Sequence, residues 1–267
     1  MNKFVVFSDV DGTLLDSNNR ILNSTLYSIN ELKKKDIDFL IVSGRSPNAI
    51  YPLIKEYNIK CPLICYGGAL ILDINNNILY SKVISKDKAK TIIEYINKCK
   101  FDLTYNIFSY FKWIVPFIDK RVLHEQELVK CIPLVGTIDD IKEEGVHKLL
   151  LMCNPNQIDE ILISLKNKFE DFNIVKSSNI LIEINAFGVD KGIAIKEYCL
   201  INNISLDYTI AFGDNYNDIE MLETVKYGFI LSNAPSDLKT RNFILTSSND
   251  NDGIYNGLKS LNIINYN

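Results

Sequence analysis

Two aspartates follow a short apolar stretch near the start of the chain. Residues 4–7 are apolar, Asp9 and Asp11 come next, and Gly12 and Thr13 follow. Two carboxylates at the end of a buried strand are costly to desolvate unless positive charge lies between them. The pattern therefore predicts a divalent cation, phosphate chemistry or both at this point, and Gly12 permits a sharp turn there.

Three later groups of polar residues occupy similar positions, at the end of a predicted strand or the start of a predicted helix. They are Ser43-Gly44-Arg45, Lys191 within residues 188–192, and Asp214, Asn217 and Asp218 within residues 213–218. In a doubly wound parallel sheet, ligands bind outside the carboxyl ends of the strands. We therefore expect the first and the last of these groups to lie beside Asp9 and Asp11.

The elements that carry these motifs alternate between strand and helix. Strands are expected at 3–8, 38–43, 62–65, 208–212, 228–231 and 243–245, and helices at 23–35, 47–57, 191–200 and 218–224. Asn23 or Ser24 is the expected N-cap of the first helix. Short apolar strands separated by helices predict an α/β fold, with a doubly wound parallel sheet covered on both faces.

A different pattern occupies the middle of the chain. A hairpin of two strands, at 69–74 and 78–84, is expected around Asn75–Asn77. Helices are expected after it at 86–99, 120–129 and 156–169, and strands at 102–108, 111–116, 146–153, 173–177 and 180–186. Adjacent strands with short turns predict an antiparallel sheet with helices on one side. We therefore expect a core formed by residues 1–84 and 187–267 and an inserted α+β domain at 85–186. Trp113 is expected to anchor the inserted domain's own core.

Composition restricts the class of protein. The chain has 267 residues, of which 47% are hydrophobic and 23% charged, so it can bury a sizeable core. A net charge of −4 gives no general attraction to nucleic acid or anionic membrane. The six cysteines are scattered without a CxxC pair, which favours buried thiols in a reducing compartment over disulfides or zinc. With no signal-peptide pattern and no apolar stretch of about 20 residues, a soluble cytoplasmic protein of open oligomeric state is predicted.

The four motifs, in this order and with this insertion, resemble the haloacid dehalogenase (HAD) superfamily of phosphohydrolases over essentially the whole chain. The insertion resembles the type IIB cap of the Cof-like branch. The resemblance implies a Rossmann-like core with an α+β cap, and Mg²⁺-dependent hydrolysis of phosphomonoesters through an aspartyl-phosphate. It also implies small phosphorylated metabolites as substrates, with sugar phosphates first and cofactors such as pyridoxal phosphate or flavin mononucleotide next.

The resemblance also implies catalytic and metal-binding roles. Asp9 would be the nucleophile, and Asp11 would protonate the leaving alcohol and then activate water. Asp9 and Asp214 would give carboxylate ligands to Mg²⁺, and Asp11 would give its backbone carbonyl. Asp218 is a further candidate for the metal, either directly or through water, although it could instead cap a helix.

Phosphate contacts are implied for a second group of residues, namely Val10, Ser43, Gly44, Lys191 and Asn217. Lys191 would also hold Asp9 ionised. Arg45 could contact the substrate beyond its phosphate or form a surface ion pair, and the sequence favours neither.

Two details of the pattern qualify the resemblance. Gly67 replaces the asparagine of the family's Asn-Gly-Ala sequence after the third core strand, so no leaving-group contact is expected there. Residues 251–254 match the family's closing segment and are expected to be structural.

Two alternatives stay open, a phosphosugar mutase on the same scaffold and a catalytically silent phosphometabolite-binding regulator. A dehalogenase is disfavoured, because Asp11 and Asp214 suit phosphoryl transfer.

Overall fold

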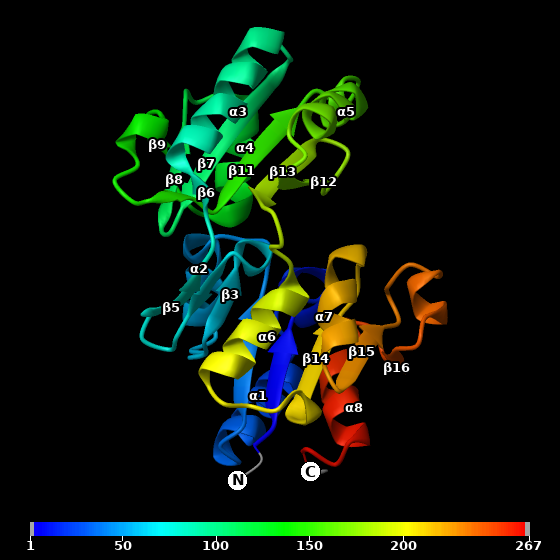
Figure 1. Ribbon diagram of the computed structural model, residues 1–267. Helices are drawn as coiled ribbons and strands as arrows, with labels where there is room; N and C mark the ends of the chain where they lie inside the picture. Colours follow the sequence, from blue (N-terminus) through cyan, green and yellow to red (C-terminus); the bar gives the residue numbers. More distant parts are fainter. Residues whose placement is uncertain (1–2, 265–267) are drawn as a thin grey trace. The chain divides into compact units, whose positions relative to one another are not determined.

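The computed structural model describes residues 3–264, which form two compact units (Figure 1). The first unit contains residues 3–44, 54–80 and 190–264, and the second contains residues 45–53 and 81–189. The predicted insertion, 85–186, falls inside the second unit, and its role as a cap stays a prediction. Within residues 3–264, no helix has the length and apolar character needed to cross a bilayer.

An eight-stranded sheet forms the centre of the first unit, in the order β16-β15-β14-β1-β2-β3-β4-β5. Its strands are β1 (Val5–Ser8), β2 (Asp38–Val42), β3 (Leu63–Cys65), β4 (Leu70–Leu72), β5 (Ile78–Ser81), β14 (Thr209–Gly213), β15 (Tyr227–Leu231) and β16 (Ile244–Thr246). Neighbouring strands from β16 to β3 are parallel, and β4 pairs antiparallel with β3. The structure thus confirms the predicted α/β fold with a doubly wound parallel sheet, extended by the hairpin at one edge.

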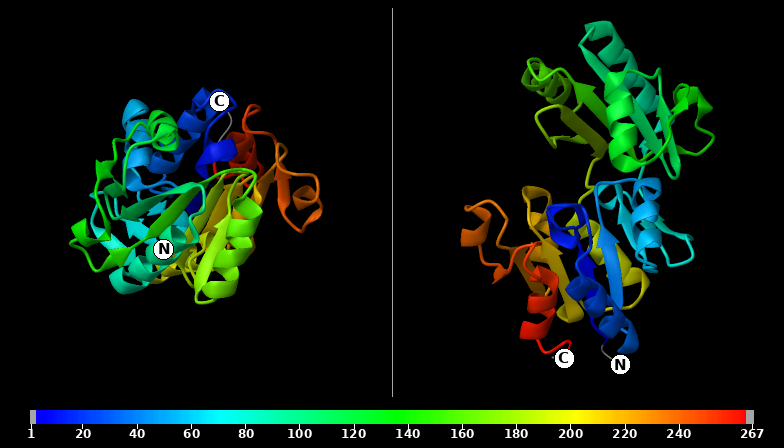
Figure 2. Two further views of the ribbon diagram at one scale, coloured as in Figure 1. Left: turned by 90° about the horizontal axis from the view of Figure 1, so that it is seen from above. Right: turned by 180° about the vertical axis from the view of Figure 1, so that it is seen from behind.

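Helices cover both faces of this sheet. In Figures 1 and 2, α6 (Lys191–Ile201) and α7 (Ile219–Thr224) lie on one face, and α1 (Asn23–Lys34) and α8 (Gly253–Ser260) lie on the other. The strand β1 lies between β14 and β2, and its Val5, Val6 and Phe7 are fully buried. Burial on both faces explains why such strands are continuous apolar runs in the sequence.

Three expectations for the first unit need correction. The N-cap position of α1 is Leu22, which gives no side-chain cap, and Ser24 Oγ instead donates to Asp252 Oδ1 at 2.5 Å. The helix α8 was not expected, because it has only eight residues and its buried Ile254 and Leu258 are one turn apart, which is too short a pattern to establish a helical period. The strand expected at 78–84 ends at Ser81, where the chain passes into the second unit.

The second unit has its own mixed sheet. The order of its six strands is β12-β13-β11-β7-β8-β9, and β6 and β10 form a separate pair. The helices are α2 (Pro47–Glu56), whose first part belongs here, and α3 (Lys86–Cys99), α4 (Lys120–Val129) and α5 (Ile158–Lys168). The strands are β6 (Ile84–Ser85), β7 (Leu103–Ser109), β8 (Lys112–Val115), β9 (Leu134–Val135), β10 (Gly145–Val146), β11 (Lys148–Cys153), β12 (Phe172–Lys176) and β13 (Leu181–Ala186).

The order of this sheet corrects one expectation and confirms another. The sheet is not purely antiparallel, because the unexpected edge strand β9 pairs parallel with β8. Trp113 does belong to the unit's own core: it is 3% exposed, its Nε1 donates to Asn106 Oδ1 at 2.9 Å, and its ring stacks on Phe108.

Candidate active site

Three of the predicted motifs meet at one edge of the first unit's sheet. Asp9 follows β1, Ser43 follows β2, and Asp214 follows β14. Because β14, β1 and β2 are adjacent and parallel, their carboxyl ends lie side by side, where ligands bind in such sheets. The Asp9 amide donates to the Phe212 carbonyl at 3.0 Å, which fixes the start of the turn after β1.

A buried lysine joins two of the aspartates. Lys191 Nζ, at the first residue of α6, donates to Asp9 Oδ1 at 2.6 Å and to Asp218 Oδ1 at 2.5 Å. The exposed fractions of Asp9, Lys191 and Asp218 are 5%, 2% and 0%. Two carboxylates therefore share one ammonium group away from water.

Asp218 has a second role at the same place. Its Oδ2 accepts from the backbone amides of Asp214 and Asn215, both at 3.0 Å, so it also closes the turn that leads into α7. The sequence left open whether Asp218 caps a helix or belongs to the site. The geometry combines the two, because one oxygen orders the turn and the other accepts from Lys191.

The Asp214 carboxylate is held by two donors. Thr13 Oγ1 donates to its Oδ1 at 2.8 Å, and Asn233 Nδ2 donates to its Oδ2 at 3.3 Å. Gly12 has a φ of +83°, and a Cβ there would overlap this carboxylate. The glycine is therefore required twice, for its left-handed backbone and for the close approach of Asp214.

Burial and crowding shift the protonation of these carboxyls. Burial raises the pKa of Asp9 to about 8, with Lys191 opposing the shift and the charge of Asp218 adding to it. Burial likewise raises the pKa of Asp214 to about 6, against the hydrogen bond from Thr13. Although burial opposes its charge, Lys191 has a pKa above the ordinary value, because Asp218 and Asp9 stabilise the ammonium. The raised values show that one lysine does not compensate the negative charge of the fully ionised cluster.

This donor set fits a hard divalent cation. Oxygens of Asp9, Asp214 and Asp218 lie within 4.8 Å of one another, and carboxylate oxygens are the ligands that Mg²⁺ prefers. Lys191 already takes one oxygen each from Asp9 and Asp218. Asp214 and the second oxygen of Asp9 are therefore the donors best suited to a metal.

The other predicted residues of the first unit lie around this cluster. Asp11 is exposed in the turn after β1, whereas Val10 is fully buried and its carbonyl accepts from the Leu15 amide at 3.0 Å. Ser43 is 2% exposed, Gly44 is half-buried, and Asn217 is exposed in the turn before α7. Their phosphate contacts stay predictions.

Arg45 lies in the second unit rather than with the aspartates of the first. There its charge acts on Glu125, whose pKa is raised by burial and lowered by the neighbouring Lys148 and Arg45. The surrounding charges do not decide between an ion-pair role and a substrate contact.

Gly67 keeps the backbone that its position requires. Its φ is +67°, its amide donates to the Ser43 carbonyl at 2.9 Å, and a Cβ would meet open space. Asparagine adopts this left-handed conformation readily. The replacement therefore changes a side chain and not the path of the chain.

Two asparagines near the site were missed in the sequence. Asn233 lies two residues beyond β15, the strand that neighbours β14 in the sheet. The backbone amide of Asn249 donates to Asn233 Oδ1 at 3.1 Å. The rule that found Asp9 and Ser43, a polar residue just after a predicted core strand, applies equally to Asn233. Asn249 has no such local signal, since only the fold brings it there.

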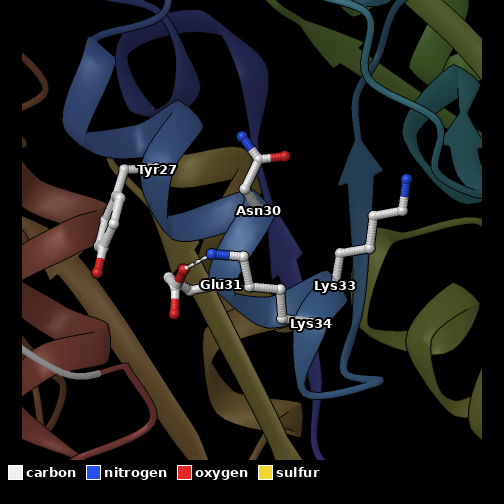
Figure 3. A pocket seen from close by; sticks show the side chains of 5 residues that line it. All are labelled: Tyr27, Asn30, Glu31, Lys33 and Lys34. Atoms are coloured by element: carbon white, nitrogen blue, oxygen red, sulfur yellow. Dashed lines mark hydrogen bonds and ion pairs between the residues drawn. The ribbon is translucent and has the colours of Figure 1, made fainter.

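A surface hollow lies elsewhere on the first unit. Its volume is about 560 Å³, and its lining residues in the described part of the chain belong to α1 (Figure 3): Tyr27, Asn30, Glu31, Lys33 and Lys34. Its Glu31–Lys34 ion pair, at 2.6 Å, satisfies both charges. It contains none of the clustered carboxylates, so it is not the candidate active site.

Comparison with known proteins gives consistent results. A family model described as haloacid dehalogenase-like hydrolase matches residues 6–258. A Haemophilus influenzae protein provisionally named a phosphatase is 31% identical over 253 residues, covering 93% of this chain and 94% of its own. A Bacillus subtilis protein, YkrA, with the same provisional name is 26% identical over 99% of this chain and 100% of its own. The crystal structure of TM0651 from Thermotoga maritima superposes with a TM-score of 0.88 at 26% identity, covering 99% and 98% of the two chains.

Proposed function

This chain belongs to the haloacid dehalogenase-like hydrolases and is a phosphatase, and we propose that it hydrolyses small phosphate monoesters through an aspartyl-phosphate on Asp9, with Mg²⁺ as its cofactor. The observation that carries the proposal is the buried group of Asp9, Lys191 and Asp218 beside Asp214. A purely structural ion pair would have no need of three carboxylates around one lysine.

The first chemical step uses Asp9 and Asp11. A carboxylate oxygen of Asp9 attacks phosphorus, the bond from phosphorus to the leaving oxygen breaks, and Asp11 gives that oxygen a proton. Lys191 opposes the rise in the Asp9 pKa that burial causes, and the bound cation would stabilise the ionised carboxylate further. Asp11 is exposed, so it can exchange protons with solvent between turnovers.

The second step returns the enzyme to its starting state. The Asp11 carboxylate takes a proton from water, the water oxygen attacks phosphorus, and the bond between phosphorus and Asp9 breaks to release phosphate. Mg²⁺, held by Asp9 and Asp214 with the Asp11 carbonyl, would neutralise the phosphate charge that these carboxylates otherwise repel. Ser43, Gly44, Val10 and Asn217 are proposed to bind the phosphoryl oxygens.

The proposed substrates are small phosphorylated metabolites, with sugar phosphates as the first class to test. The residues of the first unit's cluster suit phosphate and metal, whatever alcohol is attached. A panel of phosphorylated sugars and cofactors, compared by kcat/KM for phosphate release, would identify the leaving group. Turnover that rearranges a phosphosugar without releasing phosphate would instead indicate a mutase.

The mechanism is tested with an aryl phosphate. We expect Mg²⁺-dependent phosphate release that stops in EDTA and returns with added Mg²⁺. Asp9→Asn should abolish release while the far-UV circular dichroism stays that of the wild type. The matched control is Asp36→Asn, an exposed aspartate of the same unit at a φ of 57°, which asparagine also adopts. Wild-type turnover in Asp9→Asn, or undiminished turnover in EDTA, would refute the mechanism.

A further inference from the structure

Asn233 makes three hydrogen bonds, which join the turn after β1, the Asp214 carboxylate and the segment before α8. Its Nδ2 donates to the Gly12 carbonyl at 2.8 Å and to Asp214 Oδ2 at 3.3 Å. Its Oδ1 accepts from the Asn249 backbone amide at 3.1 Å. Every donor and acceptor of the side-chain amide is matched to a partner of the opposite kind, which fixes the orientation of the amide.

Asn249 extends this contact to the far end of the same turn. Its Nδ2 donates to the Leu15 carbonyl at 2.9 Å. The neighbouring Asp250 binds the chain just beyond the turn, where its Oδ1 accepts from the Ser17 backbone amide at 2.8 Å. Asn233 and Asn249 therefore hold the chain on both sides of residues 13 and 14.

We propose that Asn233 and Asn249 form an amide clamp that positions the turn Val10–Leu14 and the Asp214 carboxylate for a divalent cation. The inference rests on the metal-dependent function proposed above. Asn233 is a positioning residue in this role, because it acts on the metal through Asp214 and the backbone of the turn. Asn249 and Asp250, just before the residues 251–254 that were expected to be structural, thereby belong to the support of the site.

The clamp matters because the Asp214 carboxylate is repelled by the carboxylates beside it. Asp214 lies against Asp9 and Asp218 in the carboxylate cluster, and Gly12 holds a left-handed conformation beside it. Thr13 donates to one oxygen of Asp214, and Asn233 donates to the other. Removing Asn233 leaves the carboxylate held from one side only, free to rotate away from its neighbours. Loss of a partner that orients a metal ligand typically lowers metal affinity about 10–100-fold.

The test compares three alanine variants of the full chain. Asn233→Ala removes the side chain that joins Gly12 to Asp214. Asn249→Ala removes the bond to Leu15 but keeps the backbone amide that donates to Asn233. Asn251→Ala is the matched control, because among residues 3–264 its side chain donates to Ser248 Oγ alone, at 2.7 Å, within the same segment. Each protein is titrated with Mg²⁺ by calorimetry and with Mn²⁺ by the loss of its free-ion paramagnetic resonance signal, without substrate.

We expect Asn233→Ala to raise the Kd for Mg²⁺ and Mn²⁺ about tenfold or more. Asn249→Ala should raise it less, and the double variant less than the product of the two single effects, because both asparagines act on one turn. Asn251→Ala should stay within twofold of the wild type. Excess Mg²⁺ should recover much of the aryl-phosphate kcat/KM lost in Asn233→Ala.

A purely structural role gives a different result. In that case Asn233→Ala would lower the melting temperature in EDTA while its metal Kd stayed within twofold of the wild type, and the proposal would be wrong. If Asn233→Ala does not fold, an unchanged Kd in Asn249→Ala overturns the clamp equally. The proposed function and the clamp fail in different ways. If the variants differ from the wild type in metal Kd as expected but the wild type releases no phosphate, the hydrolysis is refuted and the clamp is not.

Discussion

Replacing Lys191 by methionine tests the charge balance on which the site depends. The side chain keeps its length and loses its ammonium group, which donates to Asp9 at 2.6 Å and to Asp218 at 2.5 Å. The two carboxylates are 5% and 0% exposed, so water cannot replace the lost charge. The variant must bury two uncompensated negative charges or take up a proton to avoid it.

The cost follows from the geometry. Oxygens of Asp9 and Asp218 lie within 4.8 Å of each other, and two unit charges at that distance repel by about 3 kcal/mol at an effective dielectric constant of about 20. Breaking a buried pair by removing one partner typically costs about 3–5 kcal/mol. We therefore expect Lys191→Met to lower the free energy of unfolding by about 3–5 kcal/mol at about pH 9, where Asp9, with a pKa of about 8, is ionised in the wild type.

Urea unfolding followed by far-UV circular dichroism in EDTA measures this change. Lys196→Met is the matched control, because Lys196 is exposed on the same helix and its loss changes the net charge equally. The control should stay within about 0.5 kcal/mol of the wild type, as substitutions on the surface usually do. A loss below about 1 kcal/mol in Lys191→Met would mean that the two aspartates are not both charged and buried, and the reasoning would fail.

Two further predictions concern one residue in each unit. Gly12→Ala forces a Cβ into the Asp214 carboxylate and an alanine into a φ of +83°. The free energy of unfolding in urea should fall by about 1–3 kcal/mol, and calorimetry should show a weaker affinity for Mg²⁺. Unchanged values of both would contradict the close approach of Gly12 and Asp214. Burial lowers the pKa of His147 from 6.5 to about 4. Between these pH values the unfolded chain binds a proton that the folded protein does not, so the free energy of unfolding should fall by up to about 3 kcal/mol as the pH drops from 6.5 to 4. Urea unfolding followed by Trp113 fluorescence should show this slope in the wild type and a shallower one in His147→Gln; equal slopes would refute the assignment.

The tautomer of His147 supports the sign of the last prediction. Its Nδ1 accepts from the Tyr110 amide at 3.0 Å, and its Nε2 lies 3.1 Å from Ser81 Oγ. Because Nδ1 is an acceptor, Nε2 carries the proton and donates to the serine. Protonation would turn Nδ1 into a donor facing another donor, so the imidazole stays neutral in the fold. The same reasoning excludes His147 as a base for Ser81.

The sequence predicts most of the first unit because its signals are local. Fully buried parallel strands such as β1 are continuous apolar runs, and each strand end carries the polar residue that the fold uses there. The edge strand β9 and the helix α8 lack such signals. Leu134 and Val135 are exposed and too few to show a period, and α8 begins at Gly253 after Asp252 in a left-handed conformation. Tertiary pairing, rather than propensity, decides these elements.

Residue types predict which groups enter the site but not how they share partners. Asp218 was expected near the metal, and only the structure shows that it divides its oxygens between Lys191 and two backbone amides. Asn249 reaches Asn233 and Leu15 from a segment more than 230 residues beyond the turn, as the separation of 234 from Leu15 shows. Hydrogen bonds over such separations have no periodicity, so a single sequence cannot reveal them.

The charge balance also implies an order of binding. The buried carboxylates of Asp9, Asp214 and Asp218 face the one ammonium of Lys191, so the ionised cluster carries two uncompensated negative charges. A phosphate monoester is itself a dianion near neutral pH, and its approach to this cluster would be repelled at low dielectric. A divalent cation held by these carboxylates would cancel the excess before the ester enters. We therefore expect the metal to bind the free protein without substrate, and the ester to bind measurably only after it, because the protein alone offers the phosphate more negative charge than positive.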